Sequence, residues 1–209
     1  MNAAEKVLAE TIRPVLGYLW TEHRVPKGPA AEAMLIAIGL QESRFIFRDQ
    51  IVPGKRPEEI GPATGFWQFE RDGGVAAVMQ HALTADIARR VSAAAGVAWE
   101  RDAIWRAFTK PEGDQLATAF ARLLLFADPA PLPAPSAASE DAAWACYLRN
   151  WRPGRPHRET WGRFWAAATA MVADAPAAED ATARRLAALE ARVSALEARM
   201  AALGRALAG

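Results

Sequence analysis

The chain has 209 residues, of which 52% are hydrophobic, and a formal net charge of +1. This length accommodates one domain of ordinary size with an appendage, and the apolar fraction suffices for a packed core. No apolar run approaches the roughly 18 residues of a membrane span, residues 1–20 lack a signal-peptide pattern, and the charge balance disfavours a dedicated nucleic-acid binder. One cysteine and three scattered histidines exclude an internal disulfide and disfavour a metal site, so we expect no metal and no cofactor.

Helical periodicity dominates residues 1–173, and no segment alternates convincingly as a strand does. Thr84 and Ser139 are expected N-caps, since acidic residues occupy the first turn after each. Residues 46–74 are rich in Gly and Pro, and residues 128–136 are rich in Pro; both predict long irregular stretches, which often carry function. We therefore predict an all-α domain over residues 1–173. Its predicted helices cover residues 3–23, 30–43, 75–81, 85–95, 98–108, 113–127, 139–150 and 157–173.

The composition changes after residue 173, which indicates a second segment. Residues 174–181 are typical of a linker, and residues 182–209 consist mainly of Ala, Leu, Arg and Glu. This part predicts a C-terminal coiled-coil helix that makes the protein a homo-oligomer, because its apolar residues follow a seven-residue repeat. A lone amphipathic surface helix is the alternative. The repeat is formed by Leu186, Leu189, Val193, Leu196, Met200, Leu203 and Leu207.

The charged positions of this segment favour a parallel trimer. In a parallel pairing Arg185 faces Glu190 of the neighbouring chain and Arg192 faces Glu197, whereas an antiparallel pairing sets like charges together. Residues 185–190 and 192–197 resemble the Arg-h-x-x-h-Glu pattern (h, hydrophobic) of short trimeric coiled coils. There the long Arg stem covers the apolar seam while its head pairs with Glu.

The helix predicted over residues 30–43 is apolar nearly all round and ends in Gln41-Glu42-Ser43. A helix without a polar face is normally buried, so Glu42 stands where a buried helix emerges. Burial and the negative end of the helix dipole both raise the pKa of Glu42, as a general acid near neutral pH requires. The alternative is a helix-end Glu that pairs with Arg44 or Arg48 and does no chemistry.

Three motifs occur in order along the chain: Gln-Glu-Ser-Arg-Phe at 41–45, Gly-Phe-Trp-Gln-Phe-Glu at 65–70 and Trp-Arg-Pro-Gly at 151–154. They resemble the goose-type lysozyme and soluble lytic transglycosylase superfamily, and more specifically its small phage- and prophage-encoded lysozyme-like proteins. In that superfamily a Glu-Ser pair ending a buried helix is followed by a Gly-x-x-Gln segment. The resemblance covers roughly residues 30–165 and implies a lysozyme-like helical domain that cleaves the glycan strand of peptidoglycan.

By this resemblance Glu42 is the catalytic acid and base. Ser43 would hold the N-acetyl group of a sugar or orient the site, and Gln68 would line it. The third motif corresponds loosely to the Tyr-Asn-x-Gly segment of lytic transglycosylases. Here Tyr147 and Asn150 are separated, which departs from the family's pattern and bears on whether the chain is fully active.

Glu70 is the candidate for a second carboxylate. Glycoside cleavage needs an acid at the leaving oxygen and a group on the opposite face of the sugar. If Glu70 faces Glu42, a two-carboxylate hydrolysis follows; if it pairs with Arg71, it is a surface residue. The resemblance implies a third route, because lytic transglycosylases need one carboxylate and take the rest from the substrate.

Aromatic residues around the motifs favour a sugar-binding cleft, because sugars stack their apolar faces on such rings. We expect Trp67 or Trp151 to contact the ligand, and most other rings to pack in the core. Basic residues gather near the third motif and suit either an anionic polymer such as peptidoglycan or a solvated helix face. They are Arg149, Arg152, Arg155, Arg158 and Arg163.

The sequence thus predicts an enzyme that cleaves peptidoglycan glycan strands, either a lytic transglycosylase or a muramidase. We expect it to be phage-encoded and associated with a virion or tail, and to act in the bacterial cell wall or periplasm from the virion or the host cytoplasm. The expected partners are peptidoglycan, further copies of the chain, and phage tail or virion proteins. The alternative is a catalytically inactive lysozyme-like component of a phage particle, which the loosened third motif and the coil favour.

Overall fold

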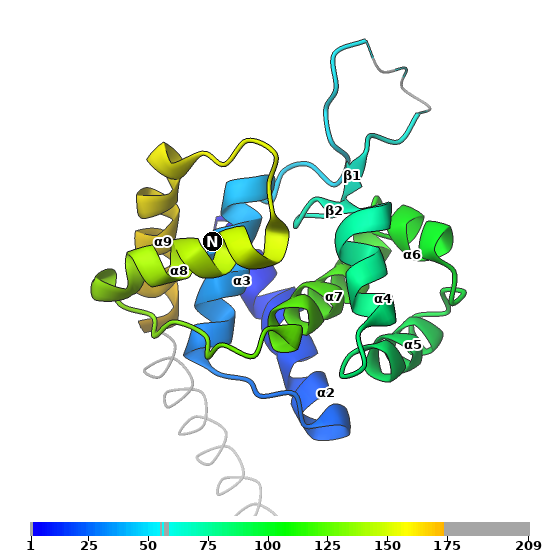
Figure 1. Ribbon diagram of the computed structural model, residues 1–209, viewed down its shortest axis with the longest axis horizontal. Coiled ribbons are helices and arrows are strands. Elements are labelled where there is room, and N and C mark those ends of the chain that lie inside the picture. Colours follow the sequence, from blue (N-terminus) through cyan, green and yellow to red (C-terminus); the bar gives the residue numbers. More distant parts are fainter. Residues whose placement is uncertain (1, 55, 57–58, 174–209) are drawn as a thin grey trace, which may run out of the picture. The chain divides into compact units, whose positions relative to one another are not determined.

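The computed structural model describes residues 2–54, 56 and 59–173, and these residues are mostly helical (Figure 1). The helical character confirms the predicted all-α class for this part of the chain. The predicted linker and coiled coil, residues 174–209, lie outside the described residues. Among the helices of the described part, none combines the length and the apolarity that crossing a bilayer requires.

The helix predicted over residues 3–23 forms as one helical run whose pitch changes in the middle. α1 (Ala3–Val7) leads into a π-helical turn, η1 (Leu8–Ile12), and α2 (Arg13–His23) follows. Pro14 has no N–H to donate to the turn before it, which explains why the wider turn lies there. The buried face of this run packs against α7 (Asp114–Ala127) and includes Ile12 and Leu19.

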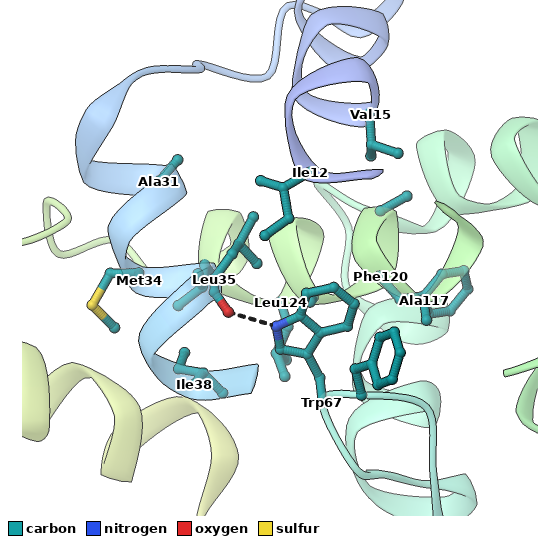
Figure 2. Packing of buried hydrophobic residues seen from close by; sticks show 14 of the residues in the cluster. Ile12, Val15, Ala31, Met34, Leu35, Ile38, Trp67, Ala117, Phe120 and Leu124 are labelled. Carbon is teal, nitrogen blue, oxygen red and sulfur yellow. Dashed lines mark hydrogen bonds between the residues drawn. The ribbon is translucent and has the colours of Figure 1, made fainter. Parts of the chain in front are cut away.

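α3 (Pro29–Glu42) lies in the hydrophobic core. All residues from Ala33 to Ile38 have an exposed fraction of 0%, as expected of a helix without a polar face. The helix contacts η1, α7 and α8 (Glu140–Trp151). Figure 2 shows Leu35 and Ile38 of α3 in the same cluster as Trp67 and Leu124, which come from a loop and from α7.

The other predicted helices form close to their expected bounds. Thr84 and Ser139 occupy the expected N-cap positions of α5 and α8, but neither side chain hydrogen-bonds the first turn of its helix. The Thr84 hydroxyl instead donates to the Val78 carbonyl at 2.7 Å, and the Ser139 hydroxyl lies 3.1 Å from that of Ser136; such side chains readily take other nearby partners. The remaining elements are η2 (Arg71–Val75), α4 (Ala76–Gln80), α5 (Ala85–Ala94), α6 (Arg101–Ala107), η3 (Pro111–Gly113), η4 (Ala137–Ser139) and α9 (Arg158–Ala173).

The stretch predicted as irregular over residues 46–74 contains a short antiparallel pair. β1 (Ala63–Thr64) pairs with β2 (Phe69–Glu70), with Thr64 opposite Phe69. The turn between them needs left-handed backbone at Gly65 (φ 74) and Gln68 (φ 47), and the Gln68 N–H donates to the Gly65 carbonyl at 3.0 Å. Strands of two residues are too short to show a period, which explains why the pattern did not predict them.

Candidate active site

The chain reverses sharply after Glu42, and Ser43 fixes this reversal. The Ser43 hydroxyl lies 2.7 Å from the carbonyl of Phe66 and 3.2 Å from that of Gly39, and it accepts the N–H of Phe45 at 3.1 Å. Phe45 has left-handed backbone (φ 57), and its ring folds onto Gly39, where a Cβ would collide with it. Ser43 is 5% exposed. Ser43 was expected either to hold a sugar N-acetyl group or to orient the site. Its hydroxyl bonds backbone groups, which fits the second role.

Glu42 is half-buried at the end of α3, and its carboxyl group accepts a hydrogen bond from a phenol. Tyr147 on α8 donates from Oη to Glu42 Oε1 at 2.6 Å. Burial raises the pKa of Glu42 to about 7; the Tyr147 hydrogen bond opposes this rise, and the charge of Glu70 adds to it. The alternative pairing with Arg48 was wrong, because both ends of that guanidinium bind Asp114 at 2.7 Å.

Glu42 lines a cleft of about 1150 Å³. Its walls come from the end of α3, the β1–β2 hairpin, η2, α4, the end of α7, α8 and the segment after α8. This volume exceeds the roughly 300–1000 Å³ of pockets that enclose a small ligand, so the cleft suits an extended one. The predicted site residues that line it are Glu42, Gln68, Glu70, Tyr147, Asn150 and Trp151.

Trp67 is a core residue, and the prediction that its ring contacts a ligand was wrong. Its exposed fraction is 0%, and its indole N–H donates to the Leu35 carbonyl at 2.9 Å (Figure 2). The large ring gains more from burial here than a solvent-facing position offers. Its carbonyl accepts the indole N–H of Trp151 at 2.8 Å. Trp151 is half-buried and lines the cleft, so of the two tryptophans it is the one that a ligand can reach.

The hairpin wall of the cleft carries Gln68 and Glu70. Gln68 donates from Nε2 to the Gly65 carbonyl at 2.8 Å, which fixes its amide at the turn. Glu70 is exposed on β2, and no ion pair to it occurs among the described residues. The alternative pairing with Arg71 was wrong, because that guanidinium binds Asp72 at 2.9 Å.

Asp128, which follows α7, is a carboxylate of the cleft that the sequence analysis missed. Its side chain is 5% exposed and accepts hydrogen bonds from Arg149 Nε at 2.7 Å and Asn150 Nδ2 at 2.8 Å. Burial raises the pKa of Asp128, but the hydrogen bonds from Arg149, the Ala130 N–H and Asn150 together bring it below its ordinary value. The sequence feature that could have identified Asp128 is its position at the end of an apolar helix, which it shares with Glu42.

Asn150 can present only one amide orientation to Asp128. Its Nδ2 also donates to the Cys146 carbonyl at 2.9 Å, so both neighbours are acceptors and the nitrogen must face them. Oδ1 is therefore the amide atom that Asn150 can offer to a ligand in the cleft.

Gln41 has a role that the sequence analysis did not assign. Its Nε2 donates to the His157 carbonyl at 3.1 Å, and its Oε1 accepts from the Thr160 hydroxyl at 2.9 Å. The first three residues of the first motif thus act separately. Gln41 joins α3 to α9, Glu42 faces the cleft, and Ser43 joins α3 to the hairpin.

Within residues 2–54, 56 and 59–173, no three His, Cys, Asp or Glu side chains are grouped so that they could hold a metal ion. The groups that the cleft offers for chemistry are carboxyl, phenol, amide, guanidinium and imidazole groups. No protein-family model, curated protein or solved structure matches the chain.

Proposed function

We propose that this chain cleaves the glycan strand of peptidoglycan, with Glu42 as the general acid. The observation that carries the proposal is a half-buried carboxyl group whose pKa is about 7, placed on an extended cleft. Near neutral pH a large fraction of such a group keeps its proton and can donate it to a leaving oxygen. The lysozyme-like resemblance of the three motifs supports the same reaction.

The hydrogen bond from Tyr147 distinguishes the two carboxyl oxygens of Glu42. Tyr147 donates to Oε1, so the transferable proton belongs on Oε2. As the glycosidic C–O bond breaks, this proton goes to the leaving oxygen while positive charge develops at the anomeric carbon. Glu42 becomes a carboxylate in the same step, and the Tyr147 hydrogen bond stabilises that charge.

Two routes complete the reaction, and they differ in what acts on the far face of the sugar. Glu70, on the hairpin wall, would activate a water or attack the anomeric carbon and give a hydrolase with reducing ends. Alternatively, the substrate's own acetamido and hydroxyl groups would act and give anhydro ends, as the resemblance to lytic transglycosylases implies. Mass spectrometry of the soluble products distinguishes the two routes.

We further propose that the chain is a phage protein mounted on a virion or tail, with residues 182–209 joining three copies in parallel. This part of the proposal rests on the seven-residue repeat and on the Arg185–Glu190 and Arg192–Glu197 pairings. Light scattering on the full chain should give a trimer; a monomer at high protein concentration would refute the coil, and a dimer would correct the stoichiometry.

The proposed reaction is tested with purified full-length protein and isolated peptidoglycan sacculi, by loss of turbidity and by release of soluble fragments. Glu42→Gln keeps the shape of the side chain and removes the acid, so the rate should fall by about 10²–10⁴-fold. Glu22→Gln is the matched control, because Glu22 is exposed on α2 and does not line the cleft. Equal cleavage by Glu42→Gln would refute the site. If the wild type is inert on every sacculus tried, the proposal is wrong and the scaffold alternative replaces it.

A further inference from the structure

The five arginines between residues 149 and 163 differ in what they contact. Three have partners: Arg149 binds Asp128 at 2.7 Å, Arg158 binds Glu140 at 2.6 Å, and Arg163 lies 4.7 Å from the ring of Phe164. Arg152 and Arg155 are exposed and line the cleft, and within the described part of the chain neither forms an ion pair. Two positive charges without a carboxylate partner therefore stand at the edge of the proposed active site.

The backbone that carries these two arginines is held in place. Arg152 ends α8 in a left-handed conformation (φ 48), and its N–H donates to the Leu148 carbonyl at 3.1 Å. Pro153 and Pro156 restrict the chain on either side of Arg155, because the proline ring fixes φ. Toward the described residues the two side chains make no other polar contact than a long one of 3.4 Å between Arg152 Nε and the Arg149 carbonyl. Their guanidinium groups can thus receive a carboxylate in the two-pronged geometry that Arg favours.

The hairpin wall of the cleft carries a carboxylate, Glu70. Glu70 is exposed there, on β2, without an ion pair among the described residues. Its charge already acts on Glu42, whose pKa it raises. An anionic group on a bound polymer would be repelled at Glu70 and attracted at Arg152 and Arg155. The charge distribution therefore gives a bound anionic polymer a preferred side.

We infer that Arg152 and Arg155 bind carboxylates of the peptide stems that peptidoglycan carries along its glycan strand. The chain then selects stem-bearing glycan over the same glycan without stems. This inference rests on the proposed function and names the substrate class of the same cleft. The stems would lie along the Arg152–Arg155 edge, while the sugars pass Glu42.

A binding measurement tests the two arginines independently of glycan cleavage. The parent protein is Glu42→Gln, which should bind without cleaving, and the probes are soluble, uncross-linked glycan strands with stems and the same strands stripped of stems by an amidase. We expect titration calorimetry to show about 10-fold tighter binding to the stem-bearing strands, the size that two exposed ion pairs supply. The double variant Arg152→Gln/Arg155→Gln should bind both preparations equally. The preference should also weaken as salt is raised, since exposed charges are screened.

The matched control removes the same charge elsewhere. Arg89→Gln/Arg90→Gln on α5 lowers the net charge equally, and neither residue lines the cleft, so this control should keep the preference. Equal binding of both preparations by the parent, or an unchanged preference in the Arg152→Gln/Arg155→Gln variant, would overturn the inference and leave the proposed function intact. Binding to neither preparation would overturn both.

Discussion

The ends of α3 and α7 present the same chemical group in the same setting, with opposite results. Glu42 ends α3, Asp128 follows α7, and both residues are half-buried at the cleft. Burial raises the pKa of Glu42 to about 7, whereas the pKa of Asp128 lies below its ordinary value. The donors differ in number and charge: Glu42 receives one neutral phenol from Tyr147, whereas Asp128 receives the guanidinium of Arg149, the amide of Asn150 and the N–H of Ala130.

This comparison shows that burial alone does not make an acid. Desolvation raises the pKa of both groups; three donors outweigh it at Asp128, and one neutral donor does not outweigh it at Glu42. In this cleft Glu42 is therefore suited to hold and release a proton near neutral pH. Asp128 is suited to stay ionised and to hold Asn150 and Arg149 in place.

The largest expected effect comes from Glu42→Gln, which replaces the carboxyl group of raised pKa by an amide that does not titrate. Besides the loss of cleavage, we expect the variant to be more stable than the wild type at pH 8 by about 1–3 kcal/mol. The sign follows because the folded-state pKa lies above the unfolded one: the contribution of Glu42 to stability is fully present below about pH 4.5 and is lost as pH rises through about 7. Thermal unfolding at pH 4 and pH 8 measures it; a gain of equal size at both would contradict this origin.

Tyr147→Phe should have the next largest effect, because it leaves Glu42 buried and removes its donor. The Tyr147 hydrogen bond lowers the pKa of Glu42, so its loss should raise that pKa above about 7. The alkaline limb of the activity profile should then move to higher pH, and the rate should fall roughly 10-fold because the carboxyl loses its orientation. Carboxyl NMR titration reads the pKa even in an inactive variant. A pKa that falls instead would show that the phenol does not stabilise the charged form.

Arg149→Gln tests the Asp128 side of the comparison. Without the guanidinium, burial should prevail and the pKa of Asp128 should rise. Asp128 contributes stability above its unfolded-state pKa and loses it as pH falls through the folded-state pKa. The variant should therefore be less stable at neutral pH, by less than about 1 kcal/mol because Arg149 is half exposed. Carboxyl NMR and denaturant unfolding measure the two quantities, and an unchanged Asp128 pKa would assign its low value to Asn150 and the Ala130 N–H.

Glu70→Gln is expected to give the smallest change if one carboxylate suffices for catalysis. Its charge raises the pKa of Glu42, so its removal should lower that pKa and move the alkaline limb to lower pH. This pKa shift is opposite in sign to that expected for Tyr147→Phe, so each variant serves as a control for the other. A rate loss as large as that of Glu42→Gln would instead assign Glu70 a direct role in a two-carboxylate mechanism.

The sequence pattern located the helices well because hydrophobic periodicity is a local property. α3 and α7–α9 begin and end within two residues of their predicted bounds. Thr84 and Ser139 stand at the predicted N-cap positions, but their hydroxyls bond other groups, since such side chains readily take other nearby partners. The β1–β2 pair was missed because its strands are too short to carry a period.

By itself the sequence determined that α3 is buried and that Glu42 stands at its exit, since a helix with no polar face has no solvent-compatible side. Tertiary structure alone decided what surrounds that carboxyl. Tyr147 reaches Glu42 across a separation of 105 residues, and Arg149 and Asn150 reach Asp128 across 21 and 22. It also decided that Trp67 fills the core while Trp151 faces the cleft. Such contacts depend on how the helices pack, which side-chain spacing within one segment does not encode.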